Sequence, residues 1–526
     1  MFKKQPSYLS ISLLFLPLVA NAAAPLFATS GDLRPLLENL DQQCAPLPAS
    51  LDEKARNLLQ QFYVQRAGQP AWQDSAQLLQ LHEQVEQLAD DGLPPRDYPL
   101  PLLANTQIER PDCADLLTSH SYLQALLHLR RGRLLQQRLE PQWRSPEHSN
   151  PDLQLATLSL ALLHLHTPAA AFTSARPDTR QYQQLRHAYA QQRLQPLSEW
   201  STLSNGALLK PGGKDERLPA LRARLIAQGY LAIPQEEQDS TYDLASQTAL
   251  ENFQRDHGLN PDGILGPASL SALNISAPTR REQLRANLER LRWLADDMRD
   301  AEVLINVAAA ELQVLRHNQL LWRTRTQVGR AERQTPLLAS RIDRLTLNPT
   351  WTVPPTILRE DKLPAIRDDI SYLERQQMSV FDRNGNPLDP HSVDWDNPGP
   401  IRLRQSAGSH NPLGRVAVRF DNPFAVYLHD TPSQPLFSKA PRAFSSGCVR
   451  VEAVDTLLAW LLTPAELESV QPRIASGTTQ QYRPQHPAPL LITYWTADAT
   501  PDGALRFYPD IYARDERLIN ALGPTP

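Results

Sequence analysis

The sequence predicts an α+β protein of several domains: a helical N-terminal region, a small three-helix unit and a mostly-β C-terminal region. At 526 residues the chain is long enough for three or four domains, at about 150 residues each. Between residues 30 and 200 apolar side chains recur at helical spacing, whereas from Val303 onward short strand-like runs replace this pattern. A hydrophobic content of 41% is sufficient for ordinary cores.

The composition excludes one class of partner. The net charge is only −4, so we expect no nucleic acid as a partner. No spacing typical of metal ligands occurs in the sequence, because His164 and His166 lie in an apolar run that is typical of a helix.

Residues 1–24 have the pattern of a secretory signal peptide. Lys3 and Lys4 precede the apolar stretch Tyr8–Ala20, and Ala20-Asn21-Ala22 is typical of a cleavage site. A membrane-spanning helix needs about 20 residues, and this stretch is shorter. We therefore expect export and cleavage, with an uncleaved membrane anchor as the alternative.

Export would place the three cysteines in an oxidising compartment. An odd number leaves at least one thiol free. Cys44 and Cys113 both lie in the N-terminal region and are candidates for a disulfide, which would leave Cys448 free. The alternative is that all three are reduced.

The helical region, residues 30–200, contains no catalytic constellation and is interpreted as a scaffold domain. Trp72 and Trp143 are interpreted as core residues rather than ligand-stacking ones. Ser201–Arg217 is polar and contains Gly and Pro, which favours a linker.

A three-helix domain is predicted for residues 218–275. Its first helix ends at Gly229, its second ends near His257-Gly258, and its third starts at Gly266-Pro267. The following segment, Arg281–Leu294, is predicted to be an amphipathic helix that connects this domain to the next.

The mostly-β domain is predicted for residues 300–500, and a charged insertion at 358–400 interrupts its strands. An insertion of this length is either functional or a disordered linker, and we favour a functional lid. A helix is predicted over Val451–Leu462, then a strand over Pro489–Thr496 and a polar tail over Asp510–Leu522.

A histidine and a cysteine stand out in this domain. His429 ends an apolar run, and Cys448 follows it by nineteen residues, directly after Ser445, Ser446 and Gly447. Thiols attack acyl carbons as thiolates and need a base, which His429 can supply. Gly447 lets backbone N–H groups approach a developing oxyanion, and Arg450 can hold a carboxylate.

This pattern resembles the signature of the L,D-transpeptidases: His, a variable gap, then Ser/Thr-(His or Ser)-Gly-Cys-(apolar)-Arg. Ser446 stands where the family often has His, so we assign it no acid–base role. The run ALENFQRDHGLNPDGILGPASLSALN resembles a small peptidoglycan-binding domain. The large periplasmic members of the family combine both with a helical region and with an insertion over the active site.

The resemblance implies a mostly-β sandwich that performs two-step acyl transfer on peptidoglycan tetrapeptide stems. Cys448 would form a thioester and a diaminopimelate amine would resolve it as a 3→3 cross-link. His429 would be the base, oriented by a backbone carbonyl or by Asp430, with Gly447 at the oxyanion. Arg450, Tyr427 and Ser446 would line the substrate site. No cofactor is required, and carbapenem-type inhibitors would acylate Cys448.

Two alternatives remain open on sequence alone. The same thioester would also support L,D-carboxypeptidase activity or D-amino-acid exchange. A non-catalytic peptidoglycan-binding protein would use only the three-helix domain, and the intact pair His429 and Cys448 argues against it.

Overall fold

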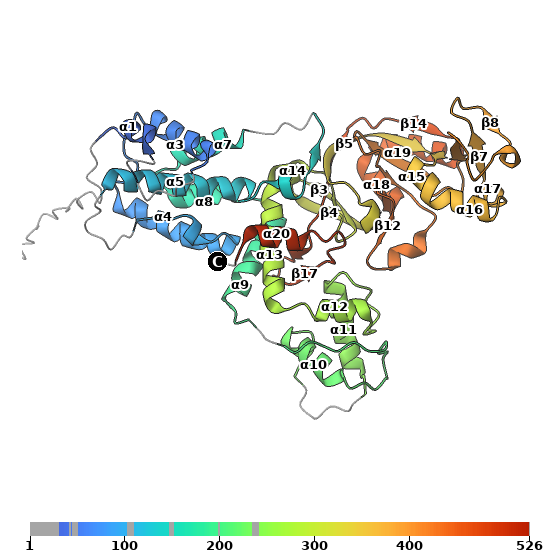
Figure 1. Ribbon diagram of the computed structural model, residues 1–526, viewed down its shortest axis with the longest axis horizontal. Helices are drawn as coiled ribbons and strands as arrows, with labels where there is room; N and C mark the ends of the chain where they lie inside the picture. The colour runs from blue at the N-terminus through green and yellow to red at the C-terminus, as the bar shows by residue number, and fades with distance from the viewer. Residues whose placement is uncertain are drawn as a thin grey trace, which may run out of the picture.

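The computed structural model describes residues 31–40, 44, 51–101, 110–146, 152–197, 200–233 and 241–524. The predicted signal peptide lies outside these residues. Within them, no helix has the length and apolar character needed to cross a membrane. Figure 1 shows N-terminal helices at one end, a sheet in the middle, an insertion at the other end and a small helical unit below.

The N-terminal helices form a scaffold around α5 (Pro111–Arg131). Asp52 and Asp74 cap two of the helices, because each carboxylate accepts a hydrogen bond from a backbone N–H group, as aspartate commonly does at this position. Trp72 is fully buried against the Tyr122 ring, as predicted. The other α-helices of this region are α1 (Arg34–Glu38), α3 (Glu53–Gln65), α4 (Ser75–Gln87), α6 (Gln136–Leu139), α7 (Leu153–Leu163), α8 (Pro168–Ala175) and α9 (Arg180–Leu194).

A disulfide joins Cys44 to Cys113, at the start of α5. Cys448 is the free cysteine among the described residues. The structure therefore contains the pairing that sequence alone left open, and it leaves a thiol in the β domain.

Trp143 packs against the core of the β domain rather than that of the scaffold, and only in part. It lies in β1 (Trp143–Arg144), which leaves the scaffold and pairs in parallel with the edge of the β domain, Trp143 opposite Leu338. Its side chain is only half-buried and borders a cavity. A local pattern of apolar residues could not reveal this, because the partner strand is almost 200 residues away in sequence.

The small helical unit contains α10 (Leu218–Ala227), α11 (Leu244–Asp256) and α12 (Pro267–Leu273). Leu203 and Leu209 are buried in its core, and Leu209 bridges to Leu265. The interpretation of residues 201–217 as a linker is therefore wrong, because this segment completes the core of the unit.

Helix α13 (Ala277–Trp293) runs through the middle of the molecule (Figure 1). Every residue from Gln283 to Trp293 is buried, including three arginines. The prediction of a helix that connects the two domains is confirmed, but its amphipathic character was wrong, because α9, α5 and α20 (Asp515–Leu522) surround it. The predicted polar tail thus contains a packed helix.

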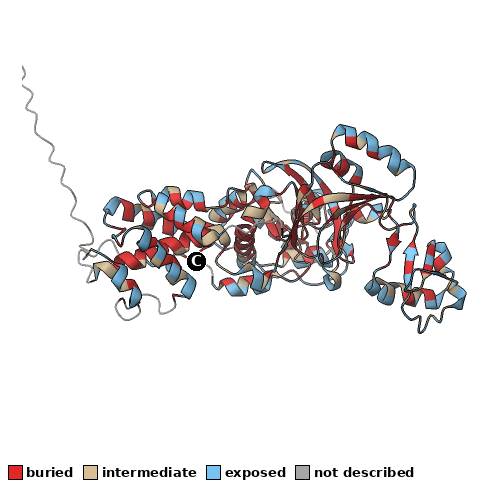
Figure 2. Ribbon diagram, turned by 90° about the horizontal axis from the view of Figure 1, so that it is seen from above, coloured by how far each residue is buried: buried red, intermediate tan, exposed pale blue. Residues whose placement is uncertain are grey.

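The β domain has one mixed sheet in the strand order β1-β5-β10-β11-β13-β4-β3-β2-β15. Because β15 also pairs with β5, the sheet closes on itself and is not a two-sheet sandwich. Figure 2 shows that many residues of its strands are buried. Its strands besides β1 are β2 (Val303–Asn306), β3 (Glu311–Arg316), β4 (Gln319–Gly329), β5 (Leu338–Leu347), β10 (Val416–Phe420), β11 (Leu428–His429), β12 (Ala443–Ser445), β13 (Val449–Val451), β14 (Gln480–Tyr482) and β15 (Ala488–Thr493).

Further helices and a hairpin complete the domain. The apolar faces of α18 (Val454–Leu461) and α19 (Pro464–Ala475) contribute to the same core as the strands. The hairpin of β16 (Ala497–Ala499) and β17 (Leu505–Phe507) touches the three-helix unit, since His257 stacks on Phe507 with ring centres 5.4 Å apart. Helix α14 (Ala295–Asp300) links α13 to β2.

The insertion is a folded subdomain rather than a linker. It has its own four-stranded antiparallel sheet, ordered β6-β9-β7-β8, and its own apolar core. Its elements are β6 (Trp351–Thr352), α15 (Pro355–Ile357), a π-helical turn (Leu358–Lys362), α16 (Leu363–Asp368), α17 (Tyr372–Arg375), β7 (Met378–Phe381), β8 (Pro387–Leu388) and β9 (Arg402–Gln405).

Candidate active site

Two neighbouring strands bring the predicted residues together. β11 and β13 are parallel, with Leu428 opposite Val449 and His429 opposite Arg450. Leu428 and Val449 are buried in the domain core. Because side chains alternate along a strand, His429 and Arg450 lie on the other face of the sheet. The residues two positions earlier, Tyr427 and Cys448, lie on this same face.

The His429 imidazole is buried and held by the backbone. Its Nδ1 lies 2.6 Å from the carbonyl oxygen of Asp430, so Nδ1 donates and Nε2 keeps its lone pair. Burial and the nearby Arg450 charge lower the pKa of His429 to about 3, and the Asp430 and Pro412 carbonyls oppose this shift. The imidazole is therefore neutral at pH 7 and able to accept a proton.

The Cys448 thiol is also neutral at rest. Burial raises its pKa, whereas Tyr427, Arg419 and Arg450 act in the opposite direction. The nucleophile would therefore need a base in the reaction rather than ionising by itself. The predicted helix after Cys448 begins only at Val454, because β13 comes first.

The turn before the thiol requires glycine. Gly447 has φ +115°, a conformation that side chains disfavour. Its N–H donates to the Ser445 hydroxyl at 3.1 Å, and that hydroxyl donates to the Cys448 carbonyl. The Gly447 N–H is thus already engaged, which leaves the Cys448 N–H as the candidate donor to an oxyanion.

Ser446 connects the turn to the insertion. Its hydroxyl accepts a hydrogen bond from Arg333 at 2.9 Å. The same guanidinium forms ion pairs with Glu360 and Asp361, both in the π-helical turn of the insertion. Ser446 therefore has a structural partner, in addition to its predicted place beside the substrate.

Arg450 keeps donors available. Its guanidinium donates to the side-chain oxygen of Gln327 at 2.9 Å, and burial lowers its pKa. Among the described residues no carboxylate pairs with it, and its Nε has no hydrogen-bond partner. A half-buried cation without a described counter-charge is suited to a substrate carboxylate.

The Tyr427 ring contacts both the His429 ring and a cation. The Arg419 guanidinium lies 3.9 Å from the centre of the Tyr427 ring, and that ring centre is 5.7 Å from the centre of the His429 ring. Burial raises the Tyr427 pKa, so its hydroxyl is protonated at pH 7.

Sequence reasoning missed Arg333, Arg419 and Gln327. Arg419 alternates with the buried Val418 and Phe420 in β10, and this alternation alone could have placed it on the site's face. Arg333 and Gln327 carry no local signal, since only the pairing of distant strands brings them to the turn.

Three family models match parts of the chain. They are an L,D-transpeptidase catalytic domain over residues 300–487, a "Scaffold domain" over 57–188 and a "Putative peptidoglycan binding domain" over 214–273.

Individual proteins are also similar. A Haemophilus influenzae protein named "Putative L,D-transpeptidase" is 34% identical over 260 residues, which cover 48% of this chain and 52% of that protein. The chain thus matches about half the length of this relative. The N-acetylmuramoyl-L-alanine amidase CwlL of Bacillus licheniformis is 37% identical over 73 residues, 14% of this chain and 20% of that enzyme. A crystal structure of an L,D-transpeptidase from Xylanimonas cellulosilytica (15% identity; 55% of this chain, 99% of that chain) aligns with a TM-score of 0.18, too low to establish a shared fold.

Residues 300–487, which contain His429 and Cys448, match the model of an L,D-transpeptidase catalytic domain. The chain carries an L,D-transpeptidase catalytic domain together with a peptidoglycan-binding domain, as the sequence resemblance indicated.

Proposed function

We propose that this protein is a periplasmic L,D-transpeptidase that forms 3→3 cross-links in peptidoglycan through a thioester on Cys448. The observation that carries the proposal is the shared sheet face of His429, Tyr427, Cys448 and Arg450. The His429 tautomer leaves Nε2 as the acceptor for the thiol proton.

In the first step, the Cys448 sulfur attacks the carbonyl between the L-centre of diaminopimelate and the terminal D-alanine. His429 takes the thiol proton, and the Cys448 N–H stabilises the tetrahedral oxyanion. When the C–N bond breaks, His429 returns the proton to the leaving amine of D-alanine. The stem remains bound as a thioester.

In the second step, the side-chain amine of another diaminopimelate attacks the thioester. A new amide forms, the C–S bond breaks, and His429 carries the amine's proton back to the sulfur. Arg450 binds a stem carboxylate and so positions the carbonyl. The insertion acts as a lid. Arg333 and Ser446 join it to residues 445–450, which we call the nucleophile turn.

The proposal is tested by incubating the purified protein with disaccharide-tetrapeptide muropeptides and analysing the products by mass spectrometry. Cys448→Ala is the matched control, because it removes only the sulfur. We expect dimers linked between two diaminopimelate residues, and free D-alanine, from the wild type alone. Intact-mass measurement after carbapenem treatment should show one adduct per chain, absent from the control.

The products also separate the alternatives. Tripeptides without dimers would mean that water resolves the thioester, as in a carboxypeptidase. Incorporation of an added D-amino acid would mean exchange. Dimers formed equally well by the Cys448→Ala variant would refute the nucleophile.

A further inference from the structure

A second cavity lies beside the nucleophile turn, on the side where the scaffold meets the catalytic domain. It has a volume of about 810 Å³, which is within the usual range for ligand pockets. One wall is the scaffold segment Glu140–Trp143, and another is Gln334–Leu337 before β5. Phe424 and the start of α20 complete it.

This cavity shares a wall with the nucleophile turn. The Thr335 hydroxyl donates to the Gly447 carbonyl at 2.9 Å. The Tyr512 hydroxyl accepts from the Thr335 N–H at 2.9 Å and donates to the Gly329 carbonyl at 2.7 Å. A ligand in the cavity would therefore lie next to a stem bound at Cys448.

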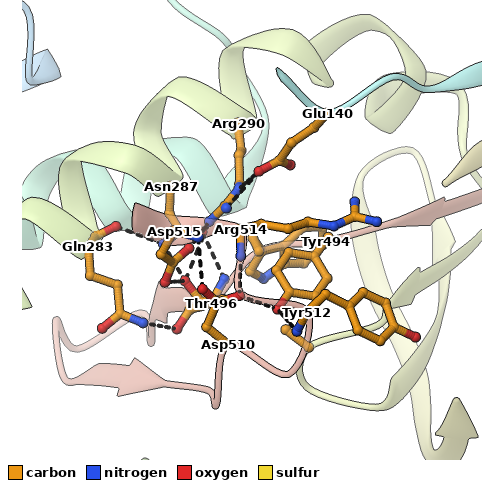
Figure 3. A network of polar contacts seen from close by, with 12 residues as sticks. Glu140, Gln283, Asn287, Arg290, Tyr494, Thr496, Asp510, Tyr512, Arg514 and Asp515 are labelled. Carbon is orange, nitrogen blue, oxygen red and sulfur yellow. Dashed lines mark hydrogen bonds and ion pairs between the residues drawn. The ribbon is translucent and has the colours of Figure 1, made fainter. Parts of the chain in front are cut away.

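Buried polar contacts hold the walls in place (Figure 3). Arg290 of α13 pairs with Glu140 from the scaffold and with Asp515 from α20. Asp510 accepts from the Tyr494 hydroxyl, and the Tyr512 N–H donates to that hydroxyl at 3.2 Å. The cavity is thus formed before any ligand binds, which reduces the ordering cost of binding.

The lining combines aromatic rings with an unpaired amide. Trp143 is half-buried and Phe424 is 47% exposed, and their rings meet edge to face at 6.4 Å. Gln142 is only 8% exposed, yet neither atom of its side-chain amide has a hydrogen-bond partner among the described residues. Leaving a buried polar group unpaired costs about 1–3 kcal/mol, so this amide is suited to a ligand that pairs with it.

The opposite wall is positively charged. It carries Arg514 and Arg517, and neither forms an ion pair with a described carboxylate. Glu140 is the acid in the lining, and its charge is already matched by Arg290.

We propose that this cavity binds an N-acetylated sugar of the glycan strand that carries the stem processed at Cys448. The apolar face of the pyranose ring packs on Trp143 and Phe424. The acetamido N–H donates to Gln142 Oε1, and its carbonyl accepts from Nε2. Arg514 and Arg517 face the carboxylates of the attached peptide. This inference rests on the proposed function.

The test compares two donors with the full-length protein: a disaccharide-tetrapeptide and the same tetrapeptide without sugar. Trp143→Ala and Gln142→Ala should raise KM for the sugar-bearing donor by about three- to tenfold. KM for the sugar-free peptide and both kcat values should stay unchanged. Phe424→Ala serves if the others fold poorly, because Phe424 is exposed. Trp460→Ala is the control, because Trp460 is an exposed tryptophan outside the cavity.

Equal KM changes for both donors would show that the cavity binds peptide, which would overturn the sugar assignment. Unchanged KM values would overturn the site altogether. If the wild type processes neither donor, the proposed function fails. Calorimetric titration with the stem-free N-acetylated disaccharide then still decides the inference: binding lost in Trp143→Ala supports it, and absence of binding refutes it.

Discussion

Helix α13 and the nucleophile turn, residues 445–450, both bury charged groups but satisfy them differently. In α13, burial opposes the charge of Arg290, but Glu140 and Asp515 outweigh it and raise the pKa of that guanidinium. In the turn, Arg450 has a neutral glutamine as its hydrogen-bond acceptor, and burial lowers its pKa.

The difference separates a structural framework from the proposed active site. The ion pairs of Arg290 join the scaffold to the catalytic domain and give this buried cation two carboxylate partners. In the site, burial pushes both His429 and Cys448 toward their neutral forms, and Arg450 has no described counter-charge. Unmatched buried groups with shifted pKa values are typical of functional sites.

The largest effect is expected from breaking the reactive side with His429→Ala. Without the base, acylation of Cys448 should slow by about 10²–10⁴. The residual rate should rise with pH toward the raised pKa of Cys448, while the wild type, with His429 at a pKa of about 3, remains active well below pH 6.5. Acylation rates across a pH series, normalised to folded protein, measure this.

The same variant should change the acid stability in a defined direction. The unfolded chain protonates His429 near pH 6.5, but the folded chain does so only near 3. The free energy of unfolding of the wild type should therefore decrease as the pH is lowered from 6.5 to about 3, because the unfolded chain binds a proton that the folded chain does not. The His429→Ala variant should not show this part of the decrease. If the acylation rate of His429→Ala and its pH profile equal those of the wild type, another group is the base.

Breaking the framework side should reduce stability and leave the chemistry intact. Arg290→Met removes the shared partner of Glu140 and Asp515, which should cost about 3–5 kcal/mol of unfolding free energy. Carbapenem acylation per folded molecule should stay within about twofold of wild type. Arg299→Met is the control, because this arginine pairs at the surface and should contribute under about 1 kcal/mol. Similar losses for the two variants would contradict the comparison.

The disulfide should contribute a smaller amount to the free energy of unfolding than the ion pairs of Arg290. Cys44→Ala/Cys113→Ala opens a link across 69 residues and should cost about 2–4 kcal/mol, measured by denaturant unfolding. Acylation of Cys448 should not change. Thiol titration of denatured, unreduced wild type should count one thiol; three would reject the bridge.

The smallest effect on activity is expected from a substitution of Arg333. This residue tests the comparison because it contacts both the insertion and the nucleophile turn. Its ion pairs lie in the insertion, and its hydrogen bond reaches Ser446 in the turn. Arg333→Ala should raise KM for a muropeptide about two- to tenfold with little change in kcat, because the lid loses its link to the turn. In Arg333→Lys, KM should lie between the values of the wild type and Arg333→Ala, because lysine keeps the charge.

Arg359→Ala is the matched control for Arg333, since Arg359 is exposed and, within the described part of the chain, forms an ion pair with Glu360 alone. A KM change as large in Arg359→Ala would show that general charge loss in the insertion, rather than the link to Ser446, explains the effect.

The sequence by itself determined the local features of this protein. Helical spacing reported the scaffold helices, and the order Ser-Gly-Cys predicted a turn whose glycine has φ +115°. The residue types around His429 and Cys448 led to the hypothesis that the two act together, because a thiol needs a base.

Only the tertiary structure decided what surrounds each element. Arginines at 285, 290 and 292 suggested a solvated helix face. Glutamates of the same helix pair with Arg285 and Arg292, but acids from distant segments pair with Arg290, and distant carbonyls accept from the other two. Trp143 became the wall of a cavity and Arg333 a link to the turn through strand pairings across the chain. Periodicity describes one element's faces; burial and charge pairing depend on what packs against them, which local sequence does not contain.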